Sequence, residues 1–349
     1  MKLEDVARRA KVSPSTVSRV LSNTGRVKAS TRARVLRIAE ELRYRPDIHA
    51  QTLAGGKSRT LGLIVSNLQN PFFLDIFHSV ESHARASGYE VVVANTGYQP
   101  KQLESAVRWM QGHRLAGLAL IVSEKEPTLL DELSEGTTPV VFYDVGTPGP
   151  RVSNIRTDYS SGMQKAVKYL YSLGHRSMAF VGHHAGLQPL QERRRSFVKA
   201  VGRYEGEVEH SIAAGTDSPD GGREAARLLL GSGSRPTAIL CVNDFMAIGV
   251  LRALREAHLR VPEDVSVVGF DNIHLSEFTS PPLTTVNVPR EQIGLAVCSA
   301  LLPERKAQHA PDNSFLIEPE LLIRDSTGPA PRPATGPDRP ASGSTAPAC

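Results

Sequence analysis

Polar side chains that could bind a small molecule follow several apolar runs of this chain. They are Ser66, Asn67, Asp144, His183, His184, Asn243, Asp244, Asp271 and Asn272. Carboxylate and amide groups can each hydrogen-bond two adjacent hydroxyls. These residue types therefore indicate a site for a polyhydroxylated ligand. Asp244 alone is expected to cap the helix that follows it.

Other chemistries lack the residues that they need. Three cysteines stand without CxxC spacing, and the adjacent His183 and His184 lack a third ligand, so we expect neither a disulfide framework nor a metal site. The stretch "GGKS" lacks the spacing of a phosphate loop. A paired-carboxylate enzyme using Asp144 and Asp271 is the alternative, which a turnover assay would reveal. We expect a protein that is not an enzyme and that carries no cofactor.

The elements that must position these residues alternate along the chain from Thr60. Apolar, strand-like runs cover 60–66, 90–96, 117–123, 139–145, 177–183, 237–244 and 264–271, and amphipathic runs cover 73–87, 102–113, 160–173, 219–231 and 244–257. This alternation predicts parallel sheets covered by helices on both faces. Two sets of roughly five strands favour two similar lobes. Ligands bind beyond the carboxyl ends of such strands, where the polar residues lie.

The first 59 residues differ from the rest in charge. They carry 14 Lys and Arg against 5 Asp and Glu, a net charge of +9, while residues 60–349 sum to −4. A basic head on a mildly acidic body indicates a polyanionic partner for the head. A solvated basic surface is the alternative.

The basic head shows three helical segments. Leu3, Val6, Ala7 and Ala10 share one face of the first, and Ser13 before Pro14 marks the start of the second. The third begins near Ser30. Two short helices joined by a tight turn, with a third behind them, predict a helix-turn-helix unit whose second helix enters a DNA major groove. A small bundle that docks on protein is the alternative.

The segment "LEDVARRAKVSPSTVSRVLSNTGRVKASTRARVLRIAEELRYRP" resembles the N-terminal signature of the lactose-repressor and purine-repressor family of bacterial transcription regulators. The resemblance implies that Pro14, Ser15 and Arg19 choose the operator sequence. It places Thr16 and Ser18 at backbone-contact positions, next to the capping Ser13. Pro14 offers no polar group to a base, so readout there is expected to be weak or by shape.

The body resembles the effector domain of the same family, which is similar to type I periplasmic binding proteins. The motifs "NPFF", "PVVFYD", "QERRRSF", "VND" and "GFD" carry this resemblance. They imply effector contacts for Phe73, Asp144, Arg193, Asn243 and Asp271. The chain departs from the family at Arg194 and Arg195, which suits a phosphorylated or acidic effector or a solvated helix face.

Residues 46–59 join head and body. Pro46 stops the third head helix, and Asp47 can cap a helix "IHAQTLA" of about two turns, too short to hold in water alone. The resemblance makes this a hinge helix that forms on operator DNA, with Leu53 as a wedge in the minor groove. Packing of Leu53 between the hinges of a dimer is the alternative. Gln51 and Ala54 replace the basic residues common in the family.

The expected architecture is a small all-α helix-turn-helix domain (1–45), a hinge (46–59), a two-lobed effector-binding and dimerisation domain (60–325) and a disordered tail (326–349). The lobes are expected near 60–157 with 288–318 and 158–287 with 319–325. A tail without leucine heptads favours a homodimer over a tetramer.

No apolar run approaches a membrane span and no signal peptide is visible, so we expect a cytoplasmic protein with no membrane partner. We therefore expect a dimeric repressor that binds a pseudo-palindromic double-stranded operator under control of a carbohydrate-like effector. A nucleobase or sugar-phosphate co-repressor, or a sugar receptor without regulation, is the alternative.

Overall fold

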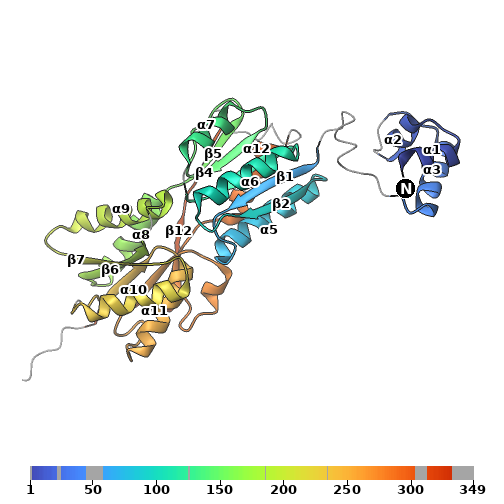
Figure 1. The fold of residues 1–349 in the computed structure, drawn as a ribbon. Helices are drawn as coiled ribbons and strands as arrows, with labels where there is room; N and C mark the ends of the chain where they lie inside the picture. Colours follow the sequence, from blue (N-terminus) through green and yellow to red (C-terminus); the bar gives the residue numbers. More distant parts are fainter. Residues whose placement is uncertain are drawn as a thin grey trace, which may run out of the picture.

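The computed structural model describes residues 2–21, 25–44, 58–124, 126–184, 186–233, 235–302 and 313–331. They form a three-helix head and a body of two α/β lobes (Figure 1). The predicted hinge helix and Leu53 lie outside the described residues. The predicted fold class of head and body is confirmed.

The head consists of α1 (Leu3–Ala10), α2 (Pro14–Leu21) and α3 (Ala29–Glu41). Their apolar faces meet in a small core that includes Val6, Val17 and Val35. Lys11 makes the turn between α1 and α2 with a left-handed φ of 52°. The Ser13 hydroxyl accepts a hydrogen bond from the Thr16 amide at 3.3 Å, which is the capping contact expected at the start of α2.

The first lobe is built on a parallel six-stranded sheet in the order β11-β5-β4-β3-β1-β2. The strands are β1 (Thr60–Val65), β2 (Glu90–Asn95), β3 (Gly117–Ile121), β4 (Val140–Tyr143), β5 (Val152–Thr157) and β11 (Ser314–Ile317). The helices are α5 (Pro71–Ala86), α6 (Pro100–Gly112), α7 (Pro127–Glu135) and α12 (Arg290–Leu301). Leu61, Leu63 and Val65 pack on the α5 and α12 side, and Ile64 packs on the α6 and α7 side.

The second lobe repeats this plan in the order β12-β10-β9-β8-β6-β7. The strands are β6 (Ser177–His183), β7 (Glu209–Gly215), β8 (Ala238–Cys241), β9 (Ser266–Asp271), β10 (Thr284–Asn287) and β12 (Glu320–Leu322). The helices are α8 (Tyr159–Ser172), α9 (Gln188–Val201), α10 (Pro219–Gly231) and α11 (Asp244–Glu256), with short 3-10 turns at Gly202–Tyr204 and His274–Glu277. Among the strands that the structure describes, only β12 runs antiparallel to its neighbour, β10.

In its described residues, the chain passes between the lobes three times. The crossings lie between β5 and α8, between β10 and α12, and between β11 and β12. Three nearby segments therefore connect two bodies that each have a complete sheet. The carboxyl ends of both sets of parallel strands end where the lobes face each other (Figure 1).

Two details of the predicted architecture are wrong. Each sheet has six strands, and β5, β7 and β10 to β12 were not predicted, because runs such as "VSNIRT" are too polar to show a buried strand. Residues 326–331 also belong to the second lobe. The Ser326 side chain is buried, and the Ala330 amide donates to the Leu173 carbonyl at 2.8 Å. The segment is held by polar contacts, which its composition does not reveal.

Candidate functional site

The outer face of α2 carries the predicted DNA-binding residues. Pro14, Ser15 and Thr16 follow Ser13 at its start, and Ser18 and Arg19 lie one turn further on. Val17 and Val20 of the same helix point into the core of the head. The helical spacing of the two valines thus places the short polar side chains and one arginine on the outer face of the helix.

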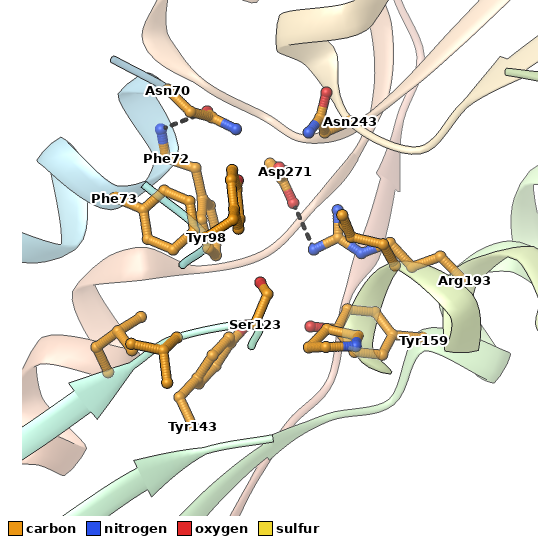
Figure 2. Close-up of a pocket in the computed structure, with 14 residues that line it drawn as sticks. Asn70, Phe72, Phe73, Tyr98, Ser123, Tyr143, Tyr159, Arg193, Asn243 and Asp271 are labelled. Atoms are coloured by element: carbon orange, nitrogen blue, oxygen red, sulfur yellow. Dashed lines mark hydrogen bonds and ion pairs between the residues drawn. The ribbon is translucent and has the colours of Figure 1, made fainter. Parts of the chain in front are cut away.

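A small cavity lies between the lobes, at the carboxyl ends of their strands (Figure 2). Its volume is about 20 Å³, enough for about one water molecule. It is lined by Asn70, Phe72, Phe73, Tyr98, Ile121, Val122, Ser123, Tyr143, Tyr159, Pro189, Leu190, Arg193, Asn243 and Asp271. Four of the five residues predicted to contact an effector, Phe73, Arg193, Asn243 and Asp271, therefore lie together.

Arg193 and Asp271 form a buried ion pair in this cavity. Arg193 Nη2 lies 3.0 Å from Asp271 Oδ1, and Nη1 donates to the Val242 carbonyl at 2.7 Å. The guanidinium also lies over the rings of Tyr159 and Phe270, at 4.7 and 4.4 Å from their centroids. The ion pair and the two cation–π contacts together hold the guanidinium in one position.

Burial shifts the pKa values of both members of the ion pair, and each member keeps an atom without a hydrogen-bond partner. Burial raises the pKa of Asp271 to about 6, although Arg193 opposes the shift. Burial disfavours the charge of Arg193, but Asp271, Tyr159 and Tyr143 together outweigh burial and raise the pKa above its ordinary value. Apart from the ion pair itself, Arg193 Nε and Asp271 Oδ1 have no hydrogen-bond partner within the described residues. One donor and one acceptor of the pair therefore keep hydrogen-bonding capacity that a bound hydroxyl or amide could use.

Asn243, and not Asp244, caps α11. Asn243 Oδ1 accepts from the Met246 amide at 2.9 Å. Asp244 is instead fully buried behind the cavity, where it accepts from the Ile273 amide at 2.8 Å and the Thr285 hydroxyl at 2.6 Å. Burial raises its pKa to about 8, and the nearby charge of Asp271 adds to the shift. The prediction of Asp244 as the cap was wrong by one residue.

Asp144 is the predicted contact residue that the structure places outside the cavity. Its carboxylate accepts from the Thr157 amide at 2.9 Å and the Tyr159 hydroxyl at 2.6 Å. It lines a neighbouring hollow of about 320 Å³ that shares Tyr159 and Pro189 with the cavity. Burial raises the pKa of Asp144 to about 6, although the bond from Tyr159 lowers it. Asp144 thus orients a lining tyrosine.

The sequence interpretation missed several lining residues. Asn70, Tyr98, Ser123, Tyr143 and Tyr159 were not predicted, although Asn70 precedes a helix-starting proline and Tyr143 ends a buried strand. A position at the end of a strand does not by itself show whether a side chain lines the cavity or points elsewhere. Ser66, for example, donates to the buried Glu124 at 2.6 Å and does not line the cavity.

The two unusual arginines of α9 have different surroundings. Arg195 lines a hollow of about 490 Å³ that shares Tyr98 and Ser123 with the cavity. Arg194 is exposed and lines none of these three spaces. Only Arg195 is therefore placed to meet a ligand that extends out of the cavity.

Within the described residues, no group of three His, Cys, Asp or Glu side chains has the arrangement of a metal site. None of the helices described combines the length and apolar character needed to cross a membrane.

A helix-turn-helix head on a two-lobed, periplasmic-binding-protein-like body defines the class of DNA-binding transcription regulators. The family "Bacterial regulatory proteins, lacI family" matches residues 2–47, and "Periplasmic binding protein-like domain" matches residues 167–327. The HTH-type transcriptional repressor PurR of Photobacterium profundum is 32% identical over 326 residues, which cover 93% of this chain and 98% of that one.

Solved structures agree with this class. The lac repressor dimer bound to operator and the anti-inducer ONPF has a TM-score of 0.82 at 30% identity, covering 94% of this chain and 99% of that one. The transcriptional regulator CelR in complex with cellobiose has a TM-score of 0.68 at 28% identity, covering 93% and 99%. The chain belongs to the LacI family of bacterial regulatory proteins, and it is a DNA-binding transcriptional repressor. The resemblance seen in the sequence is confirmed.

Proposed function

We propose that this repressor binds a pseudo-palindromic operator as a homodimer, and that a carbohydrate-like effector in the interlobe cavity sets its affinity for DNA. The observation that carries the proposal is the meeting of Phe73, Arg193, Asn243 and Asp271 in one cavity between two lobes. Each lobe contributes to this cavity, so a ligand there changes how the lobes sit on one another. The lobe that follows the linker then transmits the change to the head.

The cavity chemistry supports a carbohydrate. Apolar ring faces from Phe72, Phe73 and Tyr143 stand opposite the Arg193–Asp271 pair (Figure 2). A sugar has an apolar face and a polar rim, which fit these two sides. CelR, the relative solved with cellobiose, supports the same ligand class. The cavity is too small for a sugar ring in this structure, so binding requires the lobes or lining side chains to move.

A nucleobase co-repressor is the second candidate. The relative of Photobacterium profundum is named PurR, and a lining rich in aromatic rings suits a flat base as well as a sugar. A sugar phosphate is a third variant, for which Arg195 in the adjoining hollow offers a positive charge. The three ligands differ in charge and shape, so binding measurements separate them.

Homodimerisation is supported by an apolar surface on the second lobe. Phe278 is 70% exposed and Leu275 is 46% exposed, both at the 3-10 turn after β9. A large exposed aromatic side chain is typical of an interface. The relative solved with operator is also a dimer. Two recognition helices on two half-sites then explain a pseudo-palindromic operator.

The test is a binding titration with DNA from upstream of the protein's own coding sequence. Fluorescence anisotropy with a labelled pseudo-palindrome measures affinity alone and with sugars, sugar phosphates and purines. The proposal predicts tight binding that changes at least about tenfold with one sugar. A change with purines alone would replace the carbohydrate by a nucleobase. A protein that binds no DNA would contradict the proposal as a whole.

A further inference from the structure

Another buried carboxylate, Asp217, lies next to the cavity without lining it. It follows β7, in the loop that leads into α10, and is 7% exposed. It forms no ion pair with any residue that the structure describes. A buried carboxylate without a cation must be stabilised by hydrogen bonds.

Neutral donors from both lobes supply these bonds. Asp217 Oδ1 accepts from Asn243 Nδ2 at 2.6 Å, within the second lobe. Asp217 Oδ2 accepts from Asn67 Nδ2 at 3.3 Å, Asn70 Nδ2 at 3.2 Å and the Tyr98 hydroxyl at 2.5 Å. These last three residues belong to the first lobe. One carboxylate thus connects the two lobes through several charge-assisted contacts.

Two of the donors also cap helices at the cavity. Asn70 and Asn243 use their side-chain oxygens to cap α5 and α11, and their nitrogens point to Asp217. Burial and the charge of Asp217 raise the pKa of Tyr98 well above its ordinary value, so its hydroxyl remains a donor. Asn70, Tyr98 and Asn243 all line the cavity, where Figure 2 shows Asn70 and Asn243 beside Asp271.

The loop that carries Asp217 is closely packed. A Cβ on Gly215 would lie 2.1 Å from the Gly221 carbonyl oxygen, and one on Gly221 would lie 2.2 Å from the Thr216 carbonyl oxygen. The Ser218 hydroxyl caps α10 by accepting from the Gly221 amide at 3.0 Å. The sequence "GTDSPDGG" therefore builds a tight turn that presents Asp217 to the other lobe at a fixed place.

We propose that Asp217 is a positioning residue of the effector cavity, which orients Asn70, Tyr98 and Asn243 and holds the two lobes closed around them. The role rests on the proposed function, because it concerns the cavity assigned to the effector. A ligand that separates the lobes must break the contacts of Asp217 with Asn67, Asn70 and Tyr98. The same contacts favour the closed arrangement when no ligand is bound.

The test is hydrogen–deuterium exchange on the full-length, ligand-free protein. Asp217→Asn keeps the size of the side chain but turns an amide toward the donors of the first lobe. We expect exchange in residues 66–73 and 96–99, on the opposite lobe, to rise about tenfold. Asp131→Asn, at an exposed position on α7, is the matched control and should leave these segments unchanged.

A reciprocal variant separates lobe closure from a local role in the loop. Tyr98→Phe removes one donor in the first lobe and should speed exchange in residues 216–221 of the second, even if Asp217→Asn fails to fold. Faster exchange confined to the mutated lobe, or no change, would overturn the proposal. Neither result requires an effector or DNA, so the effector assignment is tested separately by the binding titration.

Discussion

At the scale of single residues, the cavity depends on buried ionisable side chains with very different partners. Arg193 and Asp271 neutralise each other at 3.0 Å, Asp217 is held by neutral donors, and Asp244 is held by one amide and one hydroxyl. The short motifs "QERRRSF", "VND" and "GFD" predicted three residues of the site because they resemble motifs of the family. The last two follow or end strands, and the first lies in α9. Asp217 could not be predicted, since its role depends on donors about 120 to 150 residues earlier in the chain.

Asp271→Asn should strongly destabilise the body. The change leaves the Arg193 guanidinium buried without its counter-charge, and an arginine cannot lose its proton. We expect the free energy of unfolding to fall by about 3 kcal/mol, measured by urea denaturation at pH 7. Asp264→Asn, which breaks the exposed pair with Arg260, should have a much smaller effect. Equal effects of the two changes would contradict the importance of the buried pair.

Asp244 should make the folded protein less stable as the pH rises. Its pKa is raised to about 8 in the folded protein, against an ordinary value of 3.8, so the folded state holds a proton that the unfolded state has lost. The free energy of unfolding should therefore decrease as the pH rises from about 4 to about 8.

Asp244→Asn should flatten the part of this profile between about pH 6.5 and 8. Asn imitates the neutral acid, since its oxygen can accept from the Ile273 amide and its nitrogen can donate to the Thr285 hydroxyl. Thermal melts in a series of buffers measure the change. A wild-type melting temperature that rises over this interval would show that Asp244 is already ionised in the folded protein.

At the scale of elements, local signals predicted the helices and buried strands well. Ser13 before Pro14 gave the start of α2, and the apolar runs gave β1, β3, β6 and β9 to within about two residues. The polar strand β5 was not predicted because it is stabilised by pairing with its neighbours in the sheet, β4 and β11, and not by an apolar run of its own. The order of residues 326–331 was not predicted for a similar reason, since hydrogen bonds of the backbone and of the Ser326 and Thr327 side chains hold them and not apolar side chains.

The hinge helix remains a prediction from sequence, and Leu53→Ala tests the role predicted for its leucine. If Leu53 enters the minor groove, the alanine variant should lose at least about tenfold in operator affinity and bend DNA less. Effector binding to the body should be unchanged. Anisotropy gives the affinity, and gel mobility of circularly permuted DNA fragments gives the bend. An unaltered affinity would remove the wedge assignment.

At the scale of the whole molecule, the positive charge lies in the head, and the connections between the lobes couple one lobe to the other. The net charge of +9 lies in residues 1–59, and the acidic remainder carries the cavity. Three crossings join the lobes, so a change at their interface shifts one whole sheet against the other. The overall plan could be predicted because alternating strands and helices allow few topologies, whereas the degree of closure depends on side-chain contacts such as those of Asp217.

Operator affinity should fall steeply with salt concentration. Basic side chains of two heads would neutralise several phosphates, so the logarithm of the affinity should decrease with a slope of roughly −5 or steeper against the logarithm of salt concentration. Anisotropy between about 50 and 200 mM salt measures this slope. A flat response would contradict DNA binding by the head.

The most direct measurement of the central claim is the coupling between the cavity and the operator. Any ligand that raises the melting temperature of the wild-type protein, but not that of Asp271→Asn, is titrated with and without operator DNA. If the cavity controls DNA binding, the ligand changes operator affinity, and operator changes ligand affinity by the same factor. Ligand binding in the cavity that leaves operator affinity unaltered would contradict the account.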